Sequence, residues 1–471
     1  MKRLIKFTIP TVLFLFTFCN LSLVEAKKSK SSAATKTDGK ADVLQILKKY
    51  KIDSSDVSLE VRSEDGVVEA LNPKQTKIPA SVTKILTTFA VLQTLPPGFK
   101  FKTQLFYDGT NLYLKGSGDP SFVSEKMWYL VNEFTRAEIK SVKDIIVDDT
   151  LFDQVRFDES RESKRVDRAY DAPVGAMSFN WNAVNVFVKP NEVGKKAHVF
   201  VDPESDAYTL VNQTVTVASS PKKDLIVSIS NADRKIIVSG EVSKNADEKG
   251  IFKSVAEPDI WSGIQLKAFL KQRSIESTGS VKKGQVPQLA RLVATSESKS
   301  LAEVLSDMNK FSNNFVAEML IKNLAAQEVQ QNASLKKGVE VIRSELKKIG
   351  LTNKDFEIDN PSGLTRENLL SAYALNEVLI AIKNDFTKFP VFVESLPIAG
   401  VDGTLKKRMK NSVAEGWVRA KTGHLDGVTS LAGYAGKKNG DIYTFSFLYN
   451  GPKDATIVRE AFDQIVISIL Q

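Results

Sequence analysis

The chain has very little cysteine and very little histidine. Its 471 residues include one cysteine, Cys19, and two histidines, His198 and His424. Disulfide frameworks and thiolate zinc sites need several cysteines, and a multi-histidine metal site needs more than two histidines. We therefore expect no metal and no cofactor. If the chain is a hydrolase, its general base should not be histidine.

Long apolar runs are also scarce, and the clearest one lies at the start of the chain. Residues 7–23 are predominantly apolar, follow three basic residues and precede the small Ala26. This layout is typical of a secretory signal peptide over 1–26, although the run approaches the length of a retained membrane anchor. The Lys- and Ser-rich segment 27–40 favours a basic linker. We expect an exported protein of the periplasm or extracytoplasmic cell envelope, with no stable membrane span after cleavage.

A basic arm with interleaved aromatic residues is absent as well. The formal net charge is +9, from 65 Lys and Arg against 56 Asp and Glu, and the basic residues are spread along the chain. A nucleic-acid-binding protein usually gathers them on one face or arm. We expect no nucleic-acid partner, and the sequence carries no signal for a particular oligomeric state. At roughly 150 residues per domain, the length indicates two or three domains.

Strand patterns occur near both ends of the chain. The strand-like runs are 57–62, 67–71, 416–423, 428–435 and 442–449. Turn residues join the first two runs, and Asn439-Gly440 between the last two is a strong hairpin signal. The segment 455–470 carries apolar residues at helical spacing and should cover one face of a sheet.

The segment 81–95 is apolar on nearly every side and ends at two prolines and a glycine. These features predict a buried helix. Short strands and polar turns then extend from 101 to about 288, before helical periodicity returns at 300–326 and 335–349. The middle of the chain therefore looks like an insertion into a domain formed by the two ends.

Ser81 opens the buried helix, and Lys84 follows it three residues later. This spacing places the two side chains on one helical face, where the amine could take the serine proton. The lysine would have to be neutral, and lowering its pKa from about 10.4 to about 7 costs about 4 kcal/mol. Ser-x-x-Lys is weak evidence alone, since the pattern also begins at six other serines, including Ser219.

Two further motifs make the pattern specific. Lys421-Thr422-Gly423 lies on a late strand and offers a second cation, which could help to lower the pKa of Lys84. Ser312-Asn313-Asn314 offers a hydroxyl that could relay a proton and an amide that could donate to a substrate carbonyl.

Together the three motifs resemble those of the serine penicillin-recognising enzymes. The wide gap between Ser81 and Ser312 resembles the D-alanyl-D-alanine carboxypeptidase/endopeptidase family, the class C low-molecular-mass penicillin-binding proteins. The segments 114–120, 176–180 and 359–366 look like further landmarks of that family. The resemblance covers nearly all of the chain after residue 26.

The resemblance implies an α/β fold: a penicillin-binding/β-lactamase-like catalytic domain, with an antiparallel sheet flanked by helices, and a two-part, mostly β inserted region. The implied parts are a catalytic domain at 41–100 and 289–471, an inserted domain II at 101–128 and 220–288, and an inserted domain III at 129–219. The insertion is expected to shape the cleft for a stem peptide.

By resemblance, Ser81 is the acylated nucleophile and Lys84 its base. The remaining catalytic residues would be Ser312, Asn314 and Lys421. The backbone N–H groups of Ser81 and His424 would form the oxyanion hole. Thr422, Gly423 and His424 would contact substrate. The candidates for holding charged ends of the peptide are Asp148, Phe152 and Arg366, each of which could equally be structural.

His424 departs from the family pattern, which usually has a hydroxyl residue directly after Lys-Thr-Gly. The backbone donor survives this change, but a hydroxyl that would meet the terminal carboxylate does not. Thr422 could hold the carboxylate alone, or the imidazole could contribute. Alternatively, the His424 side chain points to solvent.

The implied activity is serine DD-carboxypeptidase and DD-endopeptidase cleavage of peptidoglycan stem peptides, with covalent inhibition by β-lactam antibiotics. Two alternatives use the same residues. One is a β-lactamase, which would need fast deacylation. The other is a catalytically silent peptidoglycan-binding protein, for which retention of all five polar residues would be unnecessary.

Overall fold

The structure is a computed structural model that describes residues 43–158 and 171–471. The predicted signal peptide at 1–26 and linker at 27–40 lie outside the described residues. Within the described ranges, no helix combines the length and apolar character that a membrane crossing requires.

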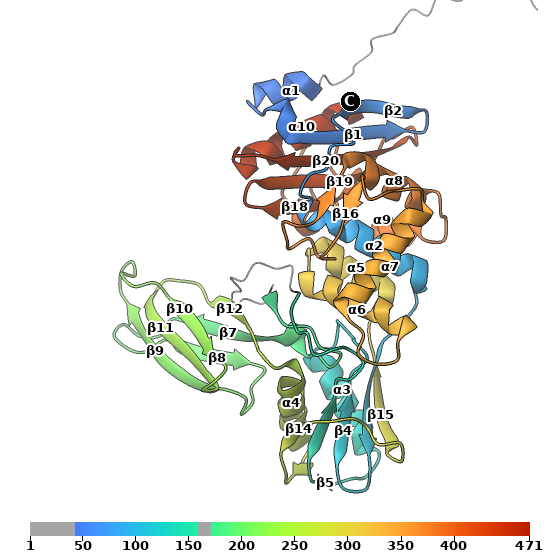
Figure 1. Cartoon of the computed structure of the whole chain (residues 1–471). Helices are drawn as coiled ribbons and strands as arrows, with labels where there is room; N and C mark the ends of the chain where they lie inside the picture. Colours follow the sequence, from blue (N-terminus) through green and yellow to red (C-terminus); the bar gives the residue numbers. More distant parts are fainter. Residues whose placement is uncertain (1–42, 159–170) are drawn as a thin grey trace, which may run out of the picture. The chain divides into compact units, whose positions relative to one another are not determined.

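A five-stranded antiparallel sheet joins the two ends of the chain (Figure 1). Its order is β18 (Val418–Leu425), β19 (Val428–Gly436), β20 (Ile442–Asn450), β1 (Val57–Ser63) and β2 (Gly66–Leu71). The early hairpin pairs with the last strand, from Val57 opposite Tyr449 to Arg62 opposite Thr444. The predicted strands and both predicted hairpins are confirmed.

Helices cover both faces of this sheet. Leu431 packs in the cluster that contains helices α1 (Val43–Lys49) and α10 (Ala455–Leu470). Its neighbour Ala432 packs in the cluster that contains α2 (Lys84–Thr94) and α8 (Ala372–Lys383). Adjacent strand residues point to opposite faces, so the sheet lies between two apolar layers. The expected α/β architecture is therefore confirmed.

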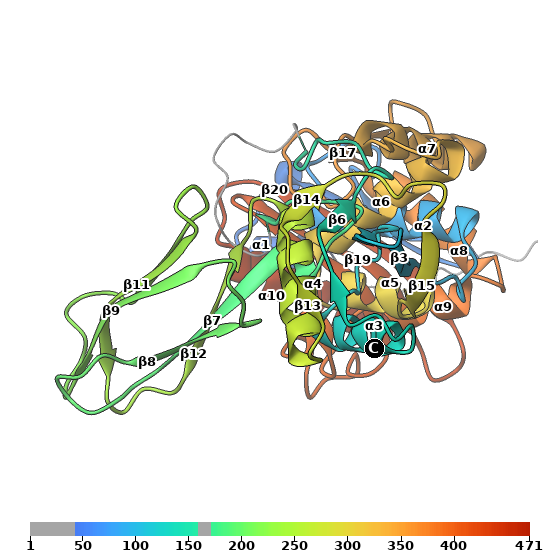
Figure 2. The same ribbon diagram turned by 90° about the horizontal axis from the view of Figure 1, so that it is seen from below.

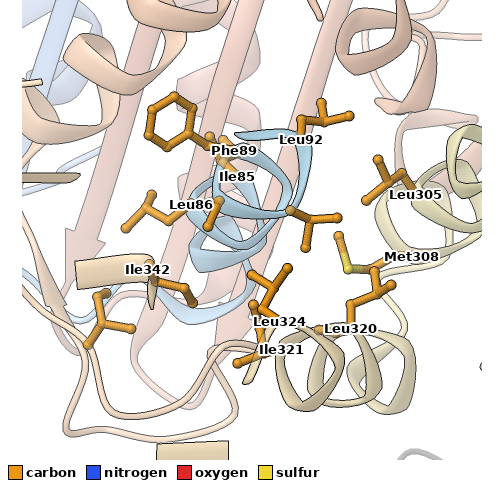
Figure 3. Close-up of a cluster of buried hydrophobic side chains, with 14 of the residues drawn as sticks. Ile85, Leu86, Phe89, Leu92, Leu305, Met308, Leu320, Ile321, Leu324 and Ile342 are labelled. Atoms are coloured by element: carbon orange, nitrogen blue, oxygen red, sulfur yellow. The ribbon is translucent and has the colours of Figure 1, made fainter. Parts of the chain in front are cut away.

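Helix α2, which follows Ser81, lies in the larger apolar cluster. Its apolar side chains pack among those of α5 (Leu301–Lys310), α6 (Asn314–Glu328) and α7 (Leu335–Lys348). Figure 3 shows Leu86 of α2 close to Ile342 of α7, and Leu320 and Leu324 of α6 below the same helix. Burial on nearly all sides gives α2 little freedom to move, because a dense core resists displacement.

The insertion contains a mixed five-stranded sheet and two three-stranded sheets. The first has the order β14 (Val281–Lys283), β6 (Ile145–Asp148), β4 (Leu112–Lys115), β3 (Lys102–Tyr107) and β15 (Arg291–Glu297). The others are β10 (Ile226–Ser230), β11 (Lys235–Ser243) and β9 (Thr209–Val217), and β12 (Lys249–Ser254), β7 (Ala183–Lys189) and β8 (His198–Asp202).

This pairing divides the insertion differently from the predicted bounds. Strand β6 falls in the range expected for domain III but pairs with β4 and β14. The insertion also continues to Glu297, because β15 pairs with β3. The sequence did not predict two helices of the insertion, α3 (Ser124–Thr135) and α4 (Pro258–Gln272). Figure 2 shows α4 alongside β14, which it contacts.

Short elements complete the described chain. They are β5 (Ser141–Val142) with β13 (Glu276–Ser277), β16 (Phe356–Glu357) with β17 (Leu369–Leu370), α9 (Phe389–Ser395), and the 3-10 turns η1 (Ser54–Asp56), η2 (Ala80–Thr83), η4 (Asn180–Asn182) and η5 (Gly403–Leu405).

Candidate active site

Ser81 lies in the 3-10 turn η2, which leads directly into α2. The helix predicted from Ser81 onward therefore begins with this tighter turn. Ala80 before it has a φ of 50°, a left-handed conformation that side chains rarely adopt. Such strain persists only where the surroundings fix it. Here Ser430 Oγ donates to the carbonyl of Pro79 at 2.6 Å and anchors the turn to β19.

Lys84 is buried, and its amine contacts oxygen atoms of Ser81, Asn314 and Ser362. Its Nζ lies 3.1 Å from Ser81 Oγ, 2.7 Å from Asn314 Oδ1 and 2.6 Å from the carbonyl of Ser362. A carbonyl oxygen only accepts, so the Asn314 and Ser362 contacts use two N–H bonds of the amine. In a neutral amine the lone pair then faces the Ser81 hydroxyl. This arrangement can remove the serine proton.

Ser312 and Asn314 flank the break between α5 and α6. Ser312 has a φ of 56°, and the Asn313 side chain caps α6 by accepting from Val316 N at 3.2 Å. The capping residue directly follows Ser312, and the new helix starts at Asn314. As a result, Asn314 contacts Lys84 while Ser312 contacts Lys421.

Lys421, on β18, is the second buried lysine of the site. Its Nζ donates to Ser312 Oγ and to the carbonyl of Thr422, each at 2.9 Å. Burial lowers the pKa of Lys421 from 10.5 to about 7. Both the ammonium and the neutral amine are therefore accessible near neutral pH, and the side chain can exchange a proton with the Ser312 hydroxyl.

At Gly423, strand β18 runs against the turn that carries Ser81. A Cβ at this position would lie 3.0 Å from Ser81 N, 2.7 Å from the Pro79 carbonyl oxygen and 2.1 Å from Ser430 Oγ. Only glycine permits such a close approach. The Ala420 N–H points to the open edge of the strand, where it donates to Pro397 O at 3.0 Å. By strand alternation, the N–H of His424 points to that same edge.

A buried loop, residues 359–368, holds the Ser362 carbonyl against Lys84. Asn360 Oδ1 accepts from Ser362 N at 2.8 Å, from Ser362 Oγ at 2.6 Å and from Gly363 N at 2.9 Å. Asn368 Nδ2 donates to the Asn360 carbonyl at 2.7 Å, and Thr87 Oγ1 of α2 donates to the Pro361 carbonyl at 2.7 Å. The sequence marked this segment only as a landmark, since its Asn-Pro-Ser-Gly run indicates no more than a turn.

Three predicted substrate-binding residues lie at the end of β18. The hydroxyls of Thr422 and Thr404 are 2.8 Å apart. His424 is exposed, and its Nδ1 lies 3.3 Å from the carbonyl oxygen of Val428 in its own hairpin. Arg366 is exposed and donates to the Asp426 carbonyl at 2.6 Å in the same turn.

Asp148 and Phe152, which were also predicted to contact the peptide, have other surroundings. Asp148 is buried at the end of β6, where it accepts from Thr150 Oγ1 at 2.7 Å and from Val286 N at 3.0 Å. Phe152 has no exposed surface and belongs to the apolar cluster around α2. These surroundings fit the structural role that the sequence left open for both residues, and their contact with a peptide stays a prediction.

The chain matches the D-Ala-D-Ala carboxypeptidase 3 (S13) family over residues 39–469. The chain belongs to that family. It is thus a serine-type D-Ala-D-Ala carboxypeptidase, as the sequence resemblance implied. The part of the chain that the structure describes contains no cluster of three or more metal-ligating side chains.

Individual relatives agree with the family assignment. The D-alanyl-D-alanine carboxypeptidase of Actinomadura sp. (strain R39) is 29% identical, over 83% of this chain and 75% of its own length. Penicillin-binding protein 4 from Haemophilus influenzae, which has also been solved with a bound β-lactam, shares the fold at a TM-score of 0.78. It is 24% identical and covers 91% of this chain and 98% of its own.

A predatory endopeptidase from Bdellovibrio bacteriovorus, solved in a penicillin G-acylated form, also shares the fold. The TM-score is 0.51 at 15% identity, with 88% of this chain and 92% of the other covered. These likenesses show a common architecture for S13 carboxypeptidases and this endopeptidase.

Proposed function

We propose that Ser81 is the nucleophile of this S13 carboxypeptidase and that Lys84 is its general base. The observation that carries the proposal is the set of three contacts of Lys84 Nζ. Two carbonyl oxygens take two N–H bonds, and the remaining direction faces Ser81 Oγ. An amine without these acceptors could turn its lone pair elsewhere.

In the first half-reaction, Ser81 Oγ attacks the carbonyl carbon of the penultimate D-alanine while its proton passes to Lys84. The backbone N–H groups of Ser81 and His424 stabilise the negative oxygen of the tetrahedral intermediate. When the C–N bond breaks, the departing amine of the terminal residue must gain a proton. Ser312 can donate it, because Lys421 Nζ lies 2.9 Å from the Ser312 hydroxyl and can replace that proton. The proton that Lys84 took from Ser81 then passes through solvent to Lys421, so Lys84 is neutral again and Lys421 regains the proton it gave.

The second half-reaction releases the acyl group. Water attacks the ester carbonyl carbon and gives its proton to the neutral amine of Lys84, and the proton returns to Ser81 Oγ as the ester bond breaks. Ser81 and Lys84 are then in their starting states. The products are a peptide shortened by one residue and free D-alanine.

We extend the substrate to peptidoglycan stem peptides, to DD-endopeptidase cleavage and to β-lactams. The endopeptidase from Bdellovibrio and the β-lactam complex of the Haemophilus protein support this extension through their shared fold. A β-lactam carries a strained amide that Ser81 can open, and the resulting ester stays attached to the protein.

The insertion is proposed to shape the cleft, because it bonds to the helix that begins with Asn314. Lys322 Nζ of α6 donates to Asp153 Oδ1 at 2.5 Å. Asn323 Nδ2 of the same helix donates to the Gly118 carbonyl at 2.8 Å. Movement of the insertion would therefore shift Asn314, which lies eight residues before Lys322 and nine before Asn323 on the same helix.

We also propose export to the cell envelope, with residues 1–26 as a signal peptide. The support is the arrangement of basic, apolar and small residues at the start of the chain, together with a family substrate found in the wall. The mass of the protein recovered from cells tests this, since an intact Met1 terminus would contradict cleavage.

Intact-protein mass after incubation with a β-lactam tests the nucleophile. Wild type should gain the mass of one acyl group, and Ser81→Ala should gain none. Ser219→Ala is the matched control, because Ser219 begins another Ser-x-x-Lys pattern on the exposed surface. It should be acylated as wild type is. An adduct on Ser81→Ala would refute the assignment, and rapid turnover of the drug would favour a β-lactamase. No adduct and no turnover in wild type would favour a silent binding protein.

A further inference from the structure

A carboxypeptidase substrate ends in a free carboxylate, next to the bond that breaks. That charge needs donors close to the nucleophile, and anions are bound best by several converging donors. At the end of β18 the structure places two hydroxyls together, those of Thr422 and Thr404, with their oxygen atoms 2.8 Å apart. Thr422 comes from the Lys-Thr-Gly motif, whereas Thr404 comes from a separate turn.

The turn that carries Thr404 is fixed on two sides. Asp402 Oδ1 accepts from Ile398 N at 2.8 Å, and its Oδ2 pairs with Lys310 Nζ at 2.6 Å. Gly403 has a φ of 53°, and a Cβ there would lie 2.8 Å from the carbonyl oxygen of Lys310. Lys310 lies two residues before Ser312. The same segment therefore positions Ser312 and the Thr404 hydroxyl.

The turn is also tied to β18. Ala399 N donates to the Val418 carbonyl at 3.0 Å, and the Ile398 backbone forms a bridge with Arg419. Thr404 itself is exposed, so its hydroxyl is accessible to a ligand. A fixed backbone with an accessible hydroxyl is the arrangement expected of a binding residue, since little freedom is lost when a ligand binds.

His424 does not supply the same function in this structure. Strand alternation places the side chains of Thr422 and His424 on one face of β18. However, the imidazole Nδ1 lies 3.3 Å from Val428 O, within its own hairpin. The hydroxyl that bonds to Thr422 is the one on Thr404.

We propose that Thr404 and Thr422 together bind the terminal carboxylate of the substrate. This inference rests on the proposed function. In the free enzyme the two hydroxyls bond to each other. In the complex each O–H donates to a carboxylate oxygen, so the hydroxyl pair exchanges one neutral hydrogen bond for two charge-assisted ones. Thr404 is then a substrate-binding residue outside the three motifs.

The test compares two thioester peptides that differ only in the leaving thiol, which carries either a carboxylate or a neutral carboxamide. Thioesters are reactive enough for both to be measured. Removing a hydrogen bond to a charged group costs about 1.5 to 3 kcal/mol, or about 10- to 150-fold. Thr404→Val should lose kcat/KM by this factor on the carboxylate thioester and by less than threefold on the carboxamide. Thr404→Ser, which keeps the hydroxyl, should stay within about threefold of wild type on both.

Equal losses on the two thioesters, or no loss on the carboxylate one, would overturn the inference. Acylation of Ser81 by a β-lactam shows whether the role of Thr404 or the proposed function itself has failed. If wild type forms no adduct at Ser81, the proposed function fails. If wild type is acylated but Thr404→Val does not discriminate between the thioesters, only the role of Thr404 fails.

Discussion

Replacing Asn360 by alanine should uncouple the 359–368 loop from the catalytic lysine. Asn360 has no exposed surface, and its Oδ1 accepts three hydrogen bonds. In Asn360→Ala the Ser362 hydroxyl can still turn to Glu318 Oε1, which lies 3.4 Å away. The backbone N–H groups of Ser362 and Gly363 lose their acceptor. At about 1 to 3 kcal/mol for each unsatisfied buried group, the cost is about 2 to 6 kcal/mol.

Thr87→Val is the matched control, because it weakens the same loop at a single bond. The Thr87 hydroxyl donates to the Pro361 carbonyl at 2.7 Å, and valine has nearly the same shape. Loss of one hydrogen bond should cost about 1 kcal/mol. The free energy of unfolding in urea measures both changes.

The acylation rate with a β-lactam gives the functional consequence. The Ser362 carbonyl uses one N–H of Lys84, so a loose loop lets the amine turn away from Ser81. A misplacement of about 1 Å in a catalytic group typically costs on the order of 100-fold. We expect a 10- to 100-fold slower acylation in Asn360→Ala and less than fivefold in Thr87→Val. Equal stability of the two variants, or wild-type acylation in Asn360→Ala, would refute the reasoning.

Three further predictions concern β18. The pKa of Lys421 is about 7 in the folded chain and 10.5 in the unfolded chain, so the unfolded state binds more protons between these values. Wild-type unfolding free energy should therefore rise from pH 7 to 10.5 relative to Lys421→Met in urea titrations, and parallel curves would contradict the low pKa. Gly423→Ala should destabilise the protein by about 1 to 3 kcal/mol and slow acylation at least tenfold, because its Cβ would lie 2.7 Å from the Pro79 oxygen. Acylation at the wild-type rate would contradict this, because it would mean that the turn can move to make room for the Cβ. His424→Thr should keep the carboxypeptidase rate within twofold of the wild-type rate. A several-fold gain would mean that a hydroxyl at position 424 helps to bind the substrate.

Much of the catalytic domain followed from the sequence because its signals are local. Apolar residues on all sides of 81–95 indicated a buried helix, and the Asn439-Gly440 turn indicated the β19–β20 hairpin. The insertion was harder to divide. Strand β6 pairs in parallel with β14, which lies more than 130 residues further along the chain. No local sequence pattern predicts a partner so far away.

The same contrast applies to the site. Asp148 and Phe152 were chosen by resemblance, and only the packed structure shows that both side chains are buried. The sequence analysis did not predict that the 359–368 loop contacts Lys84. It also did not single out the hydroxyl of Thr404. Single asparagines and threonines are common and gain meaning only from their neighbours in space.

The sequence alone determined which chemistry was available: a serine three residues before a lysine, a second lysine in Lys-Thr-Gly, and too few histidines and cysteines for a multi-histidine or thiolate metal site. The tertiary structure decided how these groups act. Burial lowers the pKa of Lys421, and two carbonyl oxygens orient Lys84 toward Ser81. Desolvation and hydrogen-bond direction depend on residues that are hundreds of positions apart in the chain, so only the folded molecule sets them.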